Sequence, residues 1–208
     1  MKNLWQCIIL ALLLIPSVII AGYPDCPDTI RNSHNCAIYL ENRLLQENNK
    51  LFLRQGNKLI IKLRNGKEKI YIDKDKDDHS KSFNFVKYFP EIDYGLVHVQ
   101  YYEGDTYFII NLLNGKDKDI QGFPLLSPNK KRFAVYSKDL DAGYNPNILA
   151  VYRVGIDYLF LEFKEEPKEW GPSSLRWIQN DQISFKKDSY RIKEQKNLKY
   201  FGGKWRIE

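Results

Sequence analysis

The sequence is poor in the side chains that most often carry catalysis or bind metal ions. Its 208 residues include three histidines, three cysteines and one methionine. It contains no Gly-x-Ser-x-Gly elbow, no Walker loop and no His-Glu-x-x-His motif. These absences argue against an elbow-type hydrolase, a P-loop nucleotide-binding protein and a zinc protease, and we expect neither a cofactor nor a bound metal.

The chain also lacks a block of like charge. The formal net charge is +6, but the lysines are interspersed with aspartates and glutamates. This distribution argues against nucleic acid as a partner. A basic surface instead favours an acidic protein or an anionic polymer of the cell envelope.

Residues 1–22 predict a secretory signal peptide, because a basic residue precedes a long apolar run that ends in Ala21 and Gly22. The run is about long enough to span a bilayer, so an uncleaved anchor is the alternative, and Pro16 near its end favours cleavage. Cys7 would leave with the signal. We therefore expect a periplasmic or secreted protein that meets the membrane only through this segment before cleavage.

Two cysteines remain in the mature chain, Cys26 and Cys36. In an oxidising compartment this pair predicts one disulfide. It would close a loop of about ten residues and contribute about 2 to 3 kcal/mol. His34 lies between the cysteines, but no second cluster of Cys or His completes a tetrahedral zinc site.

Residues 23–49 are predicted to form a disulfide-tied lead-in and a helix, and residues 50–208 a single repeat-built β domain. Ser33 is the candidate N-cap of a helix that runs to about Glu47, with Ala37, Leu40 and Leu44 along one stripe. From residue 50 the apolar pattern becomes strand-like. The expected strands are 51–54, 58–63, 67–72, 83–89, 94–102, 107–113, 147–154, 158–164, 175–178 and 183–186, with another beginning at Ile120 and weaker strands in the last segment.

Residues 123–137 are predicted to form two further strands around a tight turn, Ser-Pro-Asn-Lys, in which Asn129 tolerates the left-handed conformation. Looser copies of this arrangement recur along the chain. Each copy has an apolar residue before a turn and another that opens the next strand, and the pairs are Leu53 and Leu59, Phe89 and Leu96, Leu126 and Phe133, and Trp177 and Ile183.

Successive copies begin about 40 residues apart, a period that is typical of propeller blades. We therefore predict a mainly β fold, a small or incomplete β-propeller of about four units of three to four strands with one N-terminal helix. The alternative is an antiparallel β-sandwich or barrel, which also spaces its strands regularly.

The segment from Pro124 to Val135 resembles the repeat of TolB-type β-propellers, with Asn129-Lys130 in place of the usual Asp-Gly. More broadly, the chain resembles small secreted bacterial proteins with few-bladed propellers, some of which are periplasmic immunity proteins against type VI secretion effectors. The resemblance implies a non-enzymatic binding module with a protein partner in the cell envelope.

Two long loops interrupt the repeat, at 138–146 and 165–174, and long loops on a rigid β scaffold often carry binding residues. Tyr144 and Trp170 are the candidate contact residues in them. The polar residues that accompany these aromatic side chains are Asp139, Asp141, Asn145 and Glu169. The alternative is an enzyme or a carbohydrate-binding protein that acts on an envelope polymer with Asp139, Asp141 and Glu169.

Two other polar patterns are predicted to be structural. In the strand at 94–102, His98, Gln100 and Tyr102 share one face, which we expect to be half exposed. The aspartates at 73–78 are spaced like those of a calcium loop but lack its glycine and final glutamate. A solvated loop is expected there.

Overall fold

The computed structural model describes residues 26–208 except 28, 31, 49 and 76–78, so the predicted signal peptide lies outside the described residues. The described chain forms one helix, α1 (Ser33–Asn48), and four antiparallel sheets, A to D. Within each sheet the strands are neighbours in chain order, so each sheet is a meander.

Sheet A has three strands and the other sheets have four. Sheet A contains β1 (Phe52–Gln55), β2 (Lys58–Lys62) and β3 (Glu68–Ile72). Sheet B contains β4 (Lys81–Phe89), β5 (Tyr94–Tyr101), β6 (Asp105–Asn111) and β7 (Asp117–Asp119). Sheet C contains β8 (Phe123–Leu126), β9 (Arg132–Ser137), β10 (Ile148–Val154) and β11 (Leu159–Glu165). Sheet D contains β12 (Gly171–Gln179), β13 (Gln182–Asp188), β14 (Lys193–Phe201) and β15 (Lys204–Ile207).

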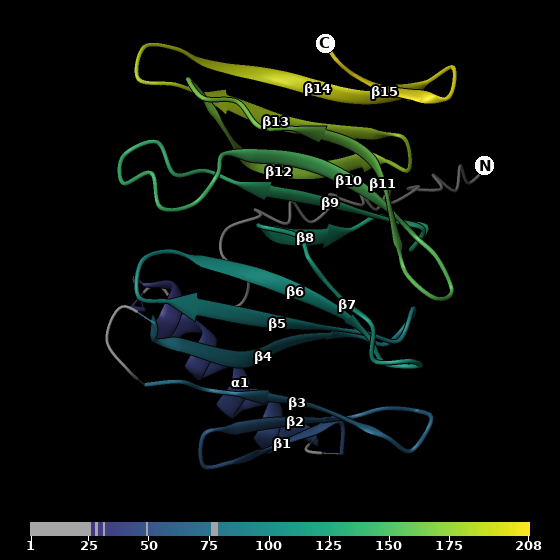
Figure 1. Ribbon diagram of the computed structural model, residues 1–208. Coiled ribbons are helices and arrows are strands. Elements are labelled where there is room, and N and C mark those ends of the chain that lie inside the picture. Colours follow the sequence, from purple (N-terminus) through teal and green to yellow (C-terminus); the bar gives the residue numbers. More distant parts are fainter. Residues whose placement is uncertain (1–25, 28, 31, 49, 76–78) are drawn as a thin grey trace, which may run out of the picture.

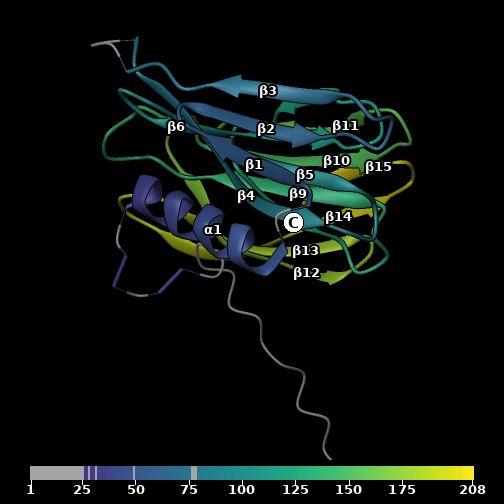
Figure 2. The same ribbon diagram turned by 90° about the horizontal axis from the view of Figure 1, so that it is seen from below.

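The four sheets follow one another in chain order, with sheet A at one end of the molecule and sheet D at the other (Figures 1 and 2). This arrangement confirms the mainly β prediction of about four propeller-like units with one N-terminal helix. In the described chain no strand of sheet D pairs with sheet A, and no closed barrel forms. The first and last units therefore each keep an outer face.

The predicted repeat matches the sheets. Its four pairs of apolar residues lie in the first and second strands of sheets A, B, C and D: Leu53 and Leu59, Phe89 and Leu96, Leu126 and Phe133, and Trp177 and Ile183. The spacing of about 40 residues was informative because each unit is a complete meander that begins with a hairpin.

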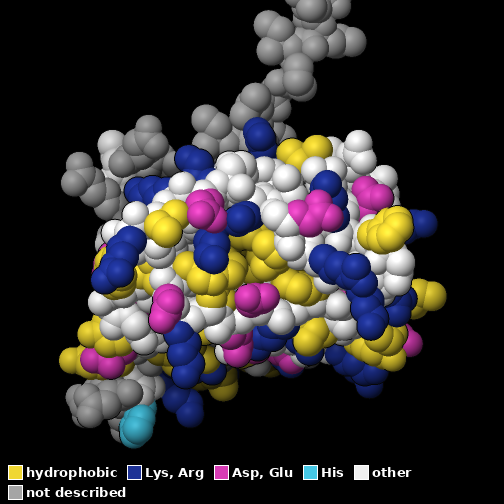
Figure 3. All heavy atoms as spheres, turned by 90° about the horizontal axis from the view of Figure 1, so that it is seen from above, with side chains coloured by type: hydrophobic (Ala, Val, Ile, Leu, Met, Phe, Trp, Pro, Cys, Tyr) yellow, Lys and Arg dark blue, Asp and Glu magenta, His cyan; other side chains and the backbone are white. Residues whose placement is uncertain are grey.

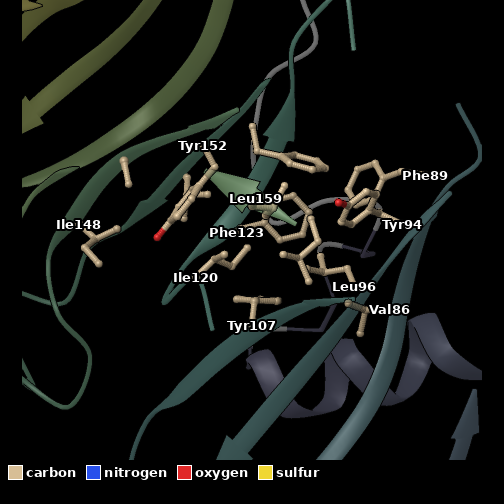
Figure 4. Close-up of a cluster of buried hydrophobic side chains, with 14 of the residues drawn as sticks. Val86, Phe89, Tyr94, Leu96, Tyr107, Ile120, Phe123, Ile148, Tyr152 and Leu159 are labelled. Atoms are coloured by element: carbon tan, nitrogen blue, oxygen red, sulfur yellow. The ribbon is translucent and has the colours of Figure 1, made fainter. Parts of the chain in front are cut away.

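Three apolar layers fill the spaces between successive sheets. Because side chains alternate along a strand, Leu96 packs in the layer between sheets B and C, whereas its neighbour Val97 packs between sheets A and B. In sheet C, Val135 and Ala134 are divided in the same way between the B–C and C–D layers. Figure 4 shows the B–C layer, where aromatic and aliphatic side chains from both sheets interdigitate.

The helix begins one residue after its cap. The side chain of Asn32 accepts a hydrogen bond from the backbone N–H of Asn35 at 2.7 Å, so Asn32, and not Ser33, is the N-cap. Asn and Ser are equally good caps, and the sequence pattern did not distinguish the two neighbours. Ala37 and Leu40 are buried in the B–C layer, while Leu44 packs against the A–B layer. The helix therefore covers one edge of two successive sheets (Figure 2).

A buried ionic network fixes the helix to these sheets. Arg54 of β1 donates from Nε and Nη2 to the two carboxylate oxygens of Glu41 on α1, each at 2.8 Å, and from Nη1 to Asp73 at 2.9 Å. The Glu41 carboxylate also accepts the backbone N–H of Phe85 in β4 at 2.8 Å. One carboxylate thus joins the helix, sheet A and sheet B.

The predicted disulfide between Cys26 and Cys36 is present. Cys36 is buried in the B–C layer, and Cys26 packs against that layer. The bond ties the lead-in to the first turns of α1 and fits a protein of an oxidising compartment.

Three further local predictions were wrong. Strand β7 has the sequence Asp-Lys-Asp, without apolar alternation, and Ile120 follows it as a buried residue instead of beginning a strand. Residues 171–174 belong to β12, so the second long connection is only 166–170. In the turn after β8, Lys130 has the positive φ of 63° and Asn129 instead accepts hydrogen bonds from Ser127 Oγ and Lys131 N.

Candidate functional site

The connections that carry the predicted site residues gather at one end of the stack, on the left of Figure 1, which we call the loop end. It comprises the connections 56–57, 102–104, 138–147, 166–170 and 189–192. Successive turns of a meander alternate between the two ends of a sheet, so the connections that follow odd-numbered strands meet at this end. The loop end is the candidate functional site.

Asp139 organises the longest of these connections. Its carboxylate accepts four backbone N–H groups of the loop that follows, those of Ala142 at 3.0 Å, Gly143 at 3.1 Å, Tyr144 at 2.9 Å and Asn145 at 2.9 Å. Burial raises the pKa of this carboxyl, but the four hydrogen bonds outweigh that effect and lower the pKa below its ordinary value. The Asp139 carboxylate therefore holds the backbone of its own loop.

Asn145 fastens the same loop to sheet B. Its side-chain oxygen accepts the backbone N–H of Asp105 at 2.9 Å, and its amide nitrogen donates to the Asp105 carboxylate at 3.0 Å. The approach is close, because a Cβ at Gly104 would lie 2.6 Å from the Asn145 oxygen, and Gly104 has a φ of 79°. Loop 138–147 therefore rests on the β5–β6 turn with little freedom.

Beneath this contact lies a buried histidine. His98 is completely buried, which corrects the expectation of a half-exposed strand face, and its Nε2 lies 2.9 Å from the Asp105 carboxylate. Burial raises the pKa of Asp105, but its contacts with His98, Ser33 and Asn145 outweigh burial and lower it. The sequence did not show that this strand face packs in the B–C layer, where the His98 ring lies against Tyr107 with centroids 5.1 Å apart.

This polar cluster differs from a catalytic triad. In a triad the histidine lies between the nucleophile and the acid, whereas here Asp105 lies between His98 and Ser33. The other ring nitrogen of His98 is buried and has no hydrogen-bond partner among the described residues. The cluster fits a role in holding the β5–β6 turn and loop 138–147 together.

The pinned loops carry exposed tyrosines. Tyr102, Tyr144 and Tyr190 are 65%, 57% and 74% exposed, and they come from the connections of sheets B, C and D. Tyr190 Oη donates to the backbone oxygen of Leu140, which joins the β13–β14 turn of sheet D to loop 138–147. Asn145 joins the same loop to sheet B. Sequence analysis did not select Tyr190, although its place between two charged strand segments indicates a turn.

Trp170 has a different environment from the one predicted. Its ring stacks on that of Phe185 in β13, with centroids 6.1 Å apart, and the ammonium of Lys187 lies 5.2 Å from its centre. It packs against the C–D layer and is only partly exposed. Glu169 and Asp141 are exposed at the same end of the stack. The structure thus groups Tyr144, Asp139 and Asn145 in one loop and places Trp170 at the margin of the core.

Beside the β5–β6 turn the surface is hollowed. Two adjoining hollows, of about 750 and 840 Å³, share five lining residues, Lys74, Ser80, Lys81, Tyr101 and Tyr102. The Lys81 ammonium lies 4.9 Å from the ring of Phe83 and 5.0 Å from that of Tyr101. Both hollows are wide and open to solvent, unlike the enclosed apolar pockets that bind small molecules.

The described residues contain no group of three or more His, Cys, Asp or Glu side chains placed to hold a metal ion. The single helix of the described chain, α1, is not long and apolar enough to cross a membrane. On the side of sheet D, basic, acidic and hydrophobic side chains are mixed (Figure 3).

Comparison with known proteins adds no assignment. No family model matches the chain, and no curated protein matches it. The fold and the candidate site define a propeller-like stack of four β meanders with tyrosine-bearing loops at one end that are joined to one another by hydrogen bonds.

Proposed function

We propose that the mature chain is a secreted, periplasmic protein-binding module without enzymatic activity, and that it binds its partner at the loop end. The observation that carries the proposal is Tyr144, an exposed aromatic side chain on a loop whose backbone N–H groups at 142–145 donate to Asp139 and which Asn145 joins to sheet B. A tyrosine presented in this way loses little conformational entropy when it binds, and tyrosine is among the residues that most often dominate binding energy.

Tyr102 and Tyr190 extend this surface on either side. The three tyrosines come from three successive sheets and are linked through loop 138–147. A macromolecular partner fits this arrangement better than a small molecule, because the surface is broad and its hollows are open. Removal of residues 1–22 takes away Lys2 and no acidic residue, so the mature chain has a formal net charge of +5 (6 − 1), which favours an acidic partner and would accelerate its encounter.

The most concrete form of the proposal is an inhibitor or immunity protein against an effector that acts in the cell envelope. This form rests on the resemblance to small secreted propeller-like proteins. The disulfide between Cys26 and Cys36 supports an oxidising compartment and is consistent with the periplasm.

The test is crosslinking at the loop end followed by affinity measurement. A photo-crosslinking amino acid replaces Tyr102 in the protein expressed with its leader in its native host, and the crosslinked envelope protein is identified by mass spectrometry. Affinity for that protein is then measured for wild type and for Tyr144→Ala, with Tyr39→Ala as the matched control. Tyr39 is also exposed but lies on α1.

We expect Tyr144→Ala to weaken binding by about a hundredfold, equivalent to about 2.8 kcal/mol, and Tyr39→Ala to have little effect. Equal affinity of wild type and Tyr144→Ala would refute the proposal. Retention of the pure protein on insoluble envelope polysaccharide, without a protein partner, would support the carbohydrate-binding alternative instead.

A further inference from the structure

Sheet A lacks the strand that completes each of the other sheets. The repeat places β1 and β2 in the positions of β4 and β5, β8 and β9, and β12 and β13. Strand β3 therefore corresponds to β6, β10 and β14, each of which is followed by a fourth strand. In the described chain no strand occupies the corresponding position beside β3, which lies along the outer edge of sheet A on the side away from α1 (Figure 2).

The free edge of β3 presents unpaired backbone groups. Two backbone hydrogen bonds lie at the two ends of the β2–β3 ladder. Asp73 N donates to Asn57 O at one end, and Leu63 N donates to Lys67 O at the other. Hydrogen-bonded pairs alternate in an antiparallel ladder, so the register makes Tyr71 and Lys69 the residues that bond to β2. The backbone N–H and C=O groups of Glu68, Ile70 and Ile72 consequently point away from β2.

The side chains on this edge are unusually apolar for an unpaired strand. Ile70 and Ile72 are 47% and 49% exposed, and Ile70 continues a cross-strand row with Ile60 and Leu53. Edge strands usually carry charges that discourage pairing. Strand β7 follows that rule with Asp-Lys-Asp, whereas the outward positions of β3 include two isoleucines.

The same hairpin concentrates positive charge. Residues 58–72 contain five basic side chains and one acidic side chain, Glu68. Arg64 is paired with Asp93 and Lys69 with Asp117. The remaining lysines, Lys58, Lys62 and Lys67, take part in no ion pair among the described residues. Pairing of β3 with β3 of a second copy would bring these like charges together, whereas an acidic strand would neutralise them.

We propose that β3 accepts an extended segment of a partner protein as the fourth strand of sheet A, and that one face of this segment carries a β-branched residue flanked by two acidic residues, each two positions away along the strand. Strand addition supplies backbone hydrogen bonds along the edge, while alternate side chains provide specificity. The β-branched side chain would extend the row formed by Ile70, Ile60 and Leu53. The acidic side chains would lie on the same face as Lys58 and Lys62, which are paired with Ile72 and Glu68 in the β2–β3 register. This surface is separate from the loop end and does not depend on the function proposed there.

The probe is a fluorescent nine-residue peptide, Thr-Thr-Glu-Thr-Val-Thr-Glu-Thr-Thr with blocked termini, in which the two Glu and the Val share one face. One control peptide has Lys in place of each Glu, and another has Pro in place of the central Val. Binding to the mature protein is measured by fluorescence anisotropy, and the binding position by amide hydrogen exchange. We expect the acidic peptide to bind and to slow exchange of the Ile70 and Ile72 amides about tenfold, with little change at Leu59.

Two substitutions test the site in the protein. Ile70→Pro removes an outward N–H without removing a bond to β2, and Ile70→Glu keeps the backbone but repels an acidic strand. Each should weaken peptide binding about tenfold or more. The matched controls are Leu161→Pro and Leu161→Glu, at an exposed residue of β11, the edge strand of a sheet that already has four strands. Thermal unfolding verifies that each variant is folded.

Tyr144→Ala should leave peptide binding unchanged, which separates this inference from the function proposed for the loop end. Equal affinity for the acidic and the proline-containing peptides would overturn strand addition. Protection of the Ile70 and Ile72 amides that increases with protein concentration, in the absence of peptide, would identify a second copy as the occupant and overturn the proposed partner.

Discussion

Glu41→Gln should destabilise the protein far more than the same substitution at the surface of the same helix. Glu41 is 5% exposed, and its carboxylate accepts two hydrogen bonds from Arg54, one from Phe85 N and one from Asn84 at 3.3 Å. A glutamine can keep the three bonds made by the Oε2 position, but its N–H group would then face Arg54 Nε. The substitution removes one charge-assisted hydrogen bond and the buried negative charge together.

The expected cost follows from these contacts. A hydrogen bond to a charged group contributes about 1.5–3 kcal/mol, and breaking a buried ion pair costs about 3–5 kcal/mol. Asp73 still binds Arg54 at 2.9 Å, so the lower value applies, about 3 kcal/mol. For a chain of this size that loss lowers Tm by roughly 6–12 °C.

The matched control is Glu47→Gln. Glu47 pairs with Arg43 at 3.5 Å on α1, with both side chains substantially exposed, and such a pair contributes about 0.3–0.5 kcal/mol. The free energies of unfolding of both variants and of wild type are measured by urea denaturation with the disulfide intact. Tryptophan fluorescence monitors the unfolding. If Glu41→Gln costs no more than Glu47→Gln, then α1 is not held by this network and the argument fails.

Two further predictions concern the loop end and the lead-in. Asp139→Ala should speed amide exchange of residues 142–145 about tenfold or more, because their four hydrogen bonds to the carboxylate disappear, while core amides of β10 stay protected. In wild type the same protection should be complete above the ordinary Asp pKa of about 3.9 and be lost as the pH falls through the lower folded pKa. Protection that persists after the Asp139 carboxyl has become protonated, as followed by NMR, would contradict the role of Asp139. Reduction of the Cys26–Cys36 disulfide should lower the free energy of unfolding by about 2–3 kcal/mol, and a Cys26→Ser, Cys36→Ala variant should have the lower stability and no response to reductant.

Local sequence signals predicted most of the strands and their grouping. Asn65-Gly66 and the Ser127–Lys130 turn were recognisable because their side chains form the turns directly, with Asn65 accepting the N–H of Lys67 and Ser127 accepting that of Arg132. Strands in sheets B and C were visible as apolar runs because both of their faces are buried. Strand β7 was missed because a fully exposed edge strand needs no apolar residue.

The candidate site was predicted less completely. Loop 138–146 was correctly identified as a departure from the repeat, and Tyr144 is exposed there. The sequence did not indicate that Asp139 is occupied by its own loop, or that Trp170 stacks on Phe185. Both outcomes depend on the exact path of a loop and on the neighbour that covers it.

His98 and β3 illustrate the division between local and tertiary causes. Alternation along β5 correctly placed His98 and Val97 on opposite faces, but the burial of the His98 face depends on the B–C layer, in which side chains of sheet C and of α1 pack against sheet B. Similarly, the period of about 40 residues revealed four units, but it could not show that sheet A has three strands and a free edge. Turn chemistry and side-chain alternation act between near neighbours and are legible in sequence, whereas burial, ion pairing and strand edges arise when distant segments meet.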